Sequence, residues 1–246
     1  MGRVIRLLLI LLLLPLSAQA EELHSGWDQL LKKHVRNGQV NYTAFKKDEP
    51  RLDVYLSRLD ATNPGSLSRQ EQLAYYINAY NAYTVKLILN NFKSDIPVNS
   101  IKDIGGLFKS PWSIRLVRLG GQALSLDEVE HEILRPRFNE PRIHFAINCA
   151  AKSCPPLISE AYTGEEVERQ LQDSTVAFLN DRRATYVAGE TLYVSKIFKW
   201  FGEDFDNDIK GFVEKYAAPE LLGQINGAGS DLQLRFLKYD WSLNGF

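Results

Sequence analysis

One short segment of the chain, IHFAINCAAKSCPP at residues 143–156, carries a histidine and both cysteines of the sequence. Cys149 comes where a predicted strand, Arg142–Asn148, ends, and Ala150 and Ala151 after it are too small to shield a thiol. Backbone N–H groups left free at a strand end would stabilise the thiolate and could also bind an oxyanion. Cys149 is therefore a candidate nucleophile.

His144 does not pair with Cys149 if the strand continues to the cysteine. The two residues are then about 16 Å apart and point to opposite faces. His144 is expected to be a hydrogen-bonded histidine of a sheet, with a ligand contact as the alternative.

A second candidate pair, Glu130 and His131, follows Ser125 on a predicted helix. The helix buries an apolar arc, and at 100° per residue Glu130 lies inside that arc with His131 at its edge. A buried carboxylate needs a partner or a raised pKa. Glu130 either orients His131 as the base for Cys149, or makes a structural contact with an arginine or the backbone.

Asn78 and Asn81 lie three residues apart on an apolar stripe of the helix predicted from Ser68 to about Asn91. Amides in such a place must be hydrogen-bonded. They are either struts that fix a neighbouring loop or polar groups that line a binding cleft.

The N-terminal residues 1–20 have the pattern of a cleaved signal peptide. Arg3 and Arg6 precede an apolar run, Leu7–Leu14, and Ala18-Gln19-Ala20 offers a small-x-small cleavage site. The run is too short for a stable membrane anchor. We expect a periplasmic or secreted protein that begins near Glu21, with one domain over residues 21–246 and no stable membrane insertion.

Export makes an even pair of cysteines a disulfide candidate, so a bond between Cys149 and Cys154 is favoured over free thiols. The spacing of the His and Cys residues matches no familiar zinc motif, and the chain has no P-loop, dinucleotide-binding glycine pattern, GxSxG or HExxH. We predict no cofactor and no metal. After loss of residues 1–20, 27 basic side chains face 30 acidic ones, which gives no reason to expect nucleic-acid binding.

The elements around these residues predict an α+β fold, a single domain with several helices packed on a small, mainly antiparallel sheet. Capping boxes mark two helix starts, at Ser68 with Glu71 and at Ser125 with Glu128, and Pro136 is expected to end the second helix. Further helices are predicted at Trp27–Arg36, Arg51–Leu59, Glu165–Asn180 and Glu203–Tyr216. Strands are predicted at Ile114–Leu119, Gln122–Leu124, Arg142–Asn148, Thr185–Val187, Thr191–Val194 and Leu232–Tyr239.

Five motifs in order, INAYNAYTV, SLDEVEHEILR, HFAINCAAKSCPP, SKIFKWFGEDF and YDWSLN, resemble the family called domain of unknown function 547, from about Val40 to Asn244. The resemblance implies that a shared signature includes Asn78, Asn81, Glu130, His131, His144 and Cys149. It implies no activity.

Three functional hypotheses remain. The first is a binding or structural module whose polar cleft takes a small molecule or peptide through Asn78, Asn81 and His144. The alternative is a thiol-dependent hydrolase or acyl/peptidyl transferase, with Cys149 as nucleophile, His131 as base and Glu130 as the orienting carboxylate. A metal-binding protein is the weaker alternative.

Overall fold

A computed structural model describes residues 16–106, 109–229 and 232–246. The helices are α1 (Leu16–His34), α2 (Tyr42–Lys47), α3 (Glu49–Ala61), α4 (Arg69–Leu89), α5 (Leu126–Glu128), α6 (Arg135–Phe138), α7 (Val167–Leu179), α8 (Ile197–Trp200), α9 (Ile209–Tyr216) and α10 (Pro219–Gly227). The strands are β1 (Val35–Arg36), β2 (Gln39–Val40), β3 (Val117–Leu119), β4 (Gln122–Leu124), β5 (Thr185–Ala188), β6 (Thr191–Val194) and β7 (Gln233–Phe236).

The fold is α+β, as predicted. In the described part of the chain the strands form three small sheets, β1-β2, β3-β4 and β5-β6-β7. The pairs are antiparallel except β6 with β7, which run parallel. Both predicted hairpins are present, and the predicted C-terminal strand forms at Gln233–Phe236.

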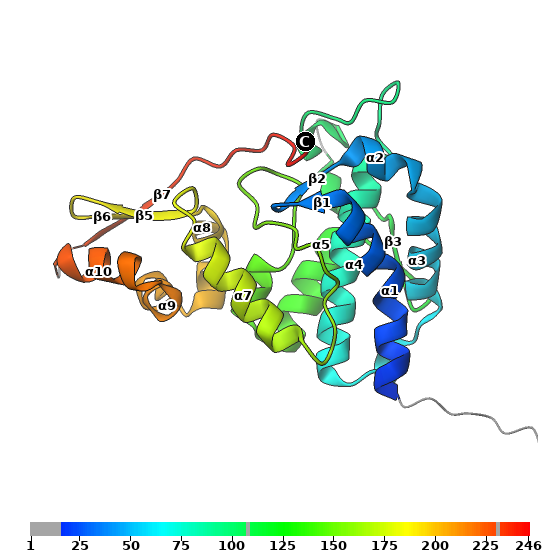
Figure 1. Cartoon of the computed structure of the whole chain (residues 1–246), viewed down its shortest axis with the longest axis horizontal. Coiled ribbons are helices and arrows are strands. Elements are labelled where there is room, and N and C mark those ends of the chain that lie inside the picture. The colour runs from blue at the N-terminus through cyan, green and yellow to red at the C-terminus, as the bar shows by residue number, and fades with distance from the viewer. Residues whose placement is uncertain (1–15, 107–108, 230–231) are drawn as a thin grey trace, which may run out of the picture.

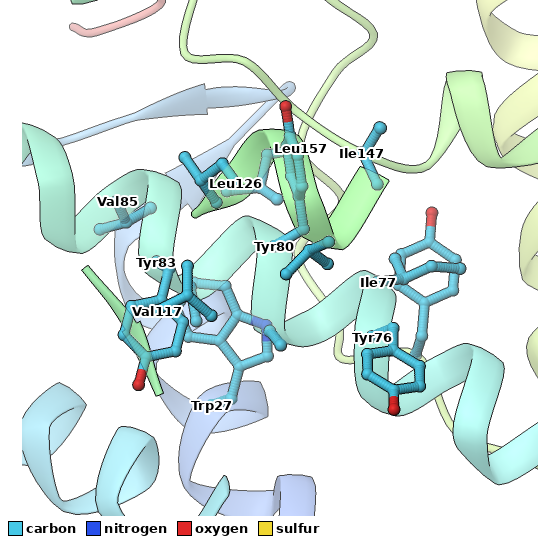
Figure 2. Packing of buried hydrophobic residues seen from close by; sticks show 14 of the residues in the cluster. Trp27, Tyr76, Ile77, Tyr80, Tyr83, Val85, Val117, Leu126, Ile147 and Leu157 are labelled. Carbon is cyan, nitrogen blue, oxygen red and sulfur yellow. The ribbon is translucent and has the colours of Figure 1, made fainter. Parts of the chain in front are cut away.

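Helix α4 forms the centre of the larger core. The predicted capping box of Ser68 and Glu71 opens it, and its side chains are buried on nearly all sides between Leu73 and Leu89. Figure 2 shows Tyr76, Tyr80 and Tyr83 leaving successive turns in different directions. The sequence predicted one buried face, but α1, α2 and α3 pack on one part of α4 while the π-helical turn Val129–Leu134 packs on another.

A second, smaller core lies under the sheet β5-β6-β7, and phenylalanine rings dominate it. Phe145, Phe198, Phe205 and Phe212 contact one another with ring centroids 4.7–6.1 Å apart. Figure 1 places this half, with α9 and α10, apart from the α1–α4 half. The segment after β7 crosses back between the halves, where Asn244 accepts a hydrogen bond from the Tyr42 hydroxyl at 2.8 Å.

Three element predictions are corrected. Pro136 does not end its helix but stands in the first turn of α6, because the preceding turn is π-helical and needs no N–H at that point. The predicted helix Glu203–Tyr216 is broken, because Asp206 and Asn207 have φ of 54° and 58° and end a 3₁₀ turn before α9 begins. The predicted strand Arg142–Asn148 is a 3₁₀ helix, Pro141–Phe145, followed by a turn.

Candidate functional site

A pocket of about 170 Å³ opens where the two cores meet. Three predicted catalytic residues, Glu130, His131 and Cys149, line it together with His144. The other lining residues are Tyr80, Trp112, Asp127, Ile147, Cys154, Pro155, Ile197, Trp200, Phe201, Tyr239 and Trp241. The described chain thus brings the predicted Cys, His and Glu residues to one cavity.

The 3₁₀ helix places His144 differently from the predicted strand. Pro141 starts this helix, and the Glu140 carboxylate caps it by accepting from the Arg142 backbone N–H at 3.0 Å. The alternation of apolar residues therefore does not assign faces here. The strand that would have separated His144 from Cys149 is not formed, so the condition for that separation is not met. His144 is 3% exposed and stacks on Phe201 at 4.1 Å.

Both cysteines carry free thiols in the structure, so the predicted disulfide is not formed there. Cys149 is half-buried and its sulfur lies 3.3 Å from the Tyr239 hydroxyl, while Cys154 is buried. Burial alone would raise the pKa of Cys149, but hydrogen bonds from the Cys154 thiol, the Tyr239 hydroxyl and the Ala151 backbone N–H outweigh it and lower the pKa. Burial raises the pKa values of Cys154 and Tyr239, which therefore keep their protons.

The backbone around Cys149 is held in an uncommon conformation. Ala150 has a φ of 60°, which costs a residue with a Cβ about 1–2 kcal/mol. Its N–H donates to the Asn148 side chain at 2.9 Å, and the Asn148 N–H donates to the Asn81 side chain at 2.8 Å. These bonds hold the turn that carries Cys149 in this strained conformation.

The amides of Asn78 and Asn81 are struts. Asn78 bonds both backbone groups of Tyr162, donating to its carbonyl at 2.7 Å and accepting from its N–H at 3.0 Å. Asn81 donates to the Ala146 carbonyl at 3.0 Å and accepts from the Asn148 N–H. Neither lines the pocket, so of the two alternatives, strut and ligand contact, the structure favours the strut for both residues.

Glu130 is buried at 8% exposure, as the arc predicted. It lies on the π-helical turn, which closes with a bond from the Arg135 N–H to the Glu130 carbonyl. Burial raises the pKa of Glu130 to about 7, and a hydrogen bond from the Tyr80 hydroxyl lowers it only in part. A carboxyl group of this kind can give or take a proton near neutral pH.

The imidazole that Glu130 faces is His144, with Oε1 3.8 Å from Nδ1. The other ring nitrogen, Nε2, donates to Asp204 at 2.6 Å, which leaves Nδ1 as the acceptor. Burial lowers the pKa of His144 more than Asp204 raises it, so the ring is neutral. Burial would raise the pKa of Asp204, but hydrogen bonds from His144 and Arg135 hold it well below its usual range.

His131 is exposed at the rim of the pocket, and its Nδ1 lies 3.1 Å from a guanidinium nitrogen of Arg135. Arginine only donates, so Nδ1 accepts and the proton of the neutral ring is on Nε2. Although the residue as a whole is exposed, its ring lies against Phe201, and this partial desolvation, followed by the charge of Arg135, lowers the pKa of His131. The Nδ1 of His131 is thus occupied by Arg135, whereas Glu130 is buried and has a pKa of about 7.

Four aromatic residues of the lining, Trp112, Trp200, Tyr239 and Trp241, form an aromatic wall of the pocket. Trp241 contacts Tyr239, Trp112 and Trp200 with centroids at 4.6, 5.6 and 5.6 Å. Sequence reasoning missed this wall and Asp204, because the residues come from segments that are distant along the chain. The resemblance motifs KIFKWFGEDF and YDWSLN contain all of them except Trp112, and were the available signal.

Among residues 16–106, 109–229 and 232–246, no group of three or more His, Cys, Asp or Glu side chains is arranged to hold a metal ion. The same part of the chain contains no helix with the length and apolar character needed to cross a membrane.

The fold and pocket define an α+β domain that combines a thiol, a buried carboxyl and an aromatic wall. A protein-family model, described as "Protein of unknown function, DUF547", matches residues 64–179. The resemblance to this family is therefore confirmed, and the matched stretch includes Glu130, His144 and Cys149. No curated protein and no solved structure matches the chain.

Proposed function

We propose that the protein is a thiol-dependent hydrolase or acyl/peptidyl transferase in which Cys149 is the nucleophile and Glu130 the acid and base. One observation carries the proposal: the sulfur of Cys149 lies 3.3 Å from the Tyr239 hydroxyl, in surroundings that lower its pKa, at the wall of a pocket that also holds a carboxyl group whose pKa burial raises to about 7. Structural thiols in apolar cores have raised pKa values instead.

The reaction follows from the protonation states. The thiolate of Cys149 attacks an acyl carbonyl, a C–S bond forms and the bond to the leaving group breaks. Protonated Glu130 gives its proton to the leaving group and becomes a carboxylate. In hydrolysis that carboxylate then takes a proton from water, which attacks the thioester and releases the thiolate.

The surrounding groups have positioning roles. Asp204 fixes the tautomer of His144, whose Nδ1 faces Glu130, and Arg135 holds Asp204 through bonds of 2.6 and 2.9 Å. The hydroxyl of Tyr239 and the N–H of Ala151 stabilise the thiolate at rest and again when it leaves. His131 lies at the entrance.

Alkylation of the reduced protein by iodoacetamide, mapped by peptide mass spectrometry across pH, tests the nucleophile. Cys149 should be modified first and below the pH range of an ordinary thiol, with Cys154 protected. Cys154→Ser keeps a donor to Cys149, whereas Cys154→Ala removes it and should move the profile to higher pH. Equal modification of both cysteines at high pH would overturn the proposal.

A binding protein without turnover is the second candidate, and the aromatic wall favours it. Concave pockets lined by aromatic side chains with a few polar groups are the usual form of ligand sites. Under this candidate a Cys149→Ser protein binds its ligand as the wild type does, whereas an enzyme loses its acyl-transfer reaction.

We also propose export to the periplasm or secretion, on the basis of the charged, apolar and small-residue pattern of residues 1–20. Residues 1–15 lie outside the described part of the chain. Expression of the full chain in a bacterial host, followed by intact-mass measurement, should give a protein that begins at Glu21. A cytoplasmic product with residues 1–20 attached would contradict export.

A further inference from the structure

The pocket that holds the thiol has a lining with a marked charge preference. Among the residues that the structure describes, no lysine or arginine lines it, whereas the carboxyl groups of Asp127 and Glu130 do. Its two imidazoles, His131 and His144, both have lowered pKa values, chiefly because of burial, and add no positive charge. Arg135 and Lys102 lie next to the lining, but both are already engaged, Arg135 by Asp204 and Lys102 by the ring of Trp241, so a cationic ligand would meet the two carboxyl groups of the lining itself.

The aromatic wall adds a second, independent preference for a cation. The faces of tryptophan and tyrosine rings carry negative charge density and attract ammonium groups within about 6 Å of the ring centroid. The chain itself gives an example, because the ammonium group of Lys102 lies 4.7 Å from the ring centroid of Trp241. Trp200 is 44% exposed and available to a ligand that enters from solvent.

Tyr239 joins this wall to the reactive sulfur. Its ring packs on Trp200 at 4.8 Å and on Trp241 at 4.6 Å, while its hydroxyl lies 3.3 Å from the sulfur of Cys149. A group held on the wall is therefore next to an acyl group carried by the cysteine.

We propose that the acyl acceptor of this enzyme is a primary amine on a short alkyl chain, bound as its ammonium ion between the aromatic wall and the carboxyl groups of Glu130 and Asp127. The inference rests on the proposed function and names its second substrate. The cavity of about 170 Å³ suits an alkylammonium group of a few carbons.

The transfer step balances with groups already present. Departure of the first leaving group turns Glu130 into a carboxylate, which then takes one proton from the bound ammonium. The free amine attacks the thioester, a C–N bond forms and the C–S bond to Cys149 breaks. The second proton of the nitrogen passes to the departing sulfur, and the product is an amide.

Binding can be measured without the thiol, in Cys149→Ser protein, by tryptophan fluorescence. The probes are n-butylammonium, n-butanol and butyrate, which differ mainly in charge. We expect n-butylammonium to bind roughly 5- to 30-fold more tightly than n-butanol, and butyrate not at all. Trp200→Leu and Glu130→Gln should each reduce this preference, whereas Glu132→Gln, on an exposed residue of the same turn that does not line the pocket, should leave it unchanged.

Equal binding of the three probes would overturn the inference. Tighter binding of choline than of n-butylammonium would also overturn it, because the site would then be assigned to a quaternary ammonium group. A second arm uses active protein with p-nitrophenyl acetate, where n-butylamine should speed turnover saturably and yield N-butylacetamide. If Cys149 is acetylated but the amine has no effect on turnover, the proposed amine acceptor is wrong and the proposed nucleophile still stands. If Cys149 is not acetylated but n-butylammonium still binds with the expected preference, only the proposed nucleophile is wrong.

Discussion

Replacing Glu130 by glutamine removes a buried acid whose ionisation opposes folding. Its pKa rises from the usual 4.5 to about 7 in the folded protein, chiefly because of burial. Below pH 4.5 the group is protonated in both states and has no effect. Between pH 4.5 and 7 the unfolded chain loses a proton that the folded chain keeps, so stability falls by about 1.4 kcal/mol per pH unit. The penalty above pH 7 is about 3 kcal/mol.

Urea unfolding of wild-type protein and Glu130→Gln at pH 4 and pH 8 measures this penalty. Glutamine keeps an acceptor for the Tyr80 hydroxyl but cannot ionise. The free energy of unfolding of the variant relative to wild type should therefore rise by about 3 kcal/mol between the two pH values. Glu132→Gln makes the same change at an exposed position and sets the baseline. A relative stability that is the same at pH 4 and pH 8 would refute the acid/base role of Glu130.

Further predictions concern the struts and the thiol. Asn81→Ala leaves the Ala146 carbonyl and the Asn148 N–H without partners and should cost about 2–5 kcal/mol in urea unfolding. Asn78→Ala should cost a similar amount. Only Asn81→Ala should change the alkylation rate of Cys149, because only Asn81 supports the turn that presents the thiol. Equal changes of the alkylation rate in both variants would contradict that role. Tyr239→Phe removes a donor to the Cys149 sulfur, so the alkylation profile should move to higher pH, and an unchanged profile would show that the hydroxyl does not stabilise the thiolate.

The parts of the fold that the sequence predicts are those with local causes. The capping box at Ser68 forms because its two hydrogen bonds lie within one turn, and the same holds at Ser125. The Gly120-Gly121 hairpin follows from positive φ angles that glycine adopts freely. The burial of Glu130 was also predictable, because helical periodicity placed it among apolar residues.

The parts that depend on distant contacts were not predictable. Apolar residues alternate at Ile143, Phe145 and Ile147, which is typical of a strand. Pro141 and the cap from Glu140 start a 3₁₀ helix instead, and Phe145 packs into a core made mainly of residues between 178 and 239. Glu130 bonds to the Tyr80 hydroxyl and faces His144 at 3.8 Å, while His131 is held by Arg135. No local pattern connects Asp204 or Tyr239 to the cysteine, because only the return of the C-terminal segment brings Tyr239 to the pocket.

The most direct test of the central claim is intact-mass and peptide analysis of reduced protein after brief exposure to p-nitrophenyl acetate at pH 7. We predict that one acetyl group is transferred to Cys149 in the wild type, that it accumulates in Glu130→Gln because release is slowed, and that it is absent from Cys149→Ser. An acetyl group on Cys154, or no acetylated cysteine in any of the proteins, would contradict a nucleophilic role for Cys149.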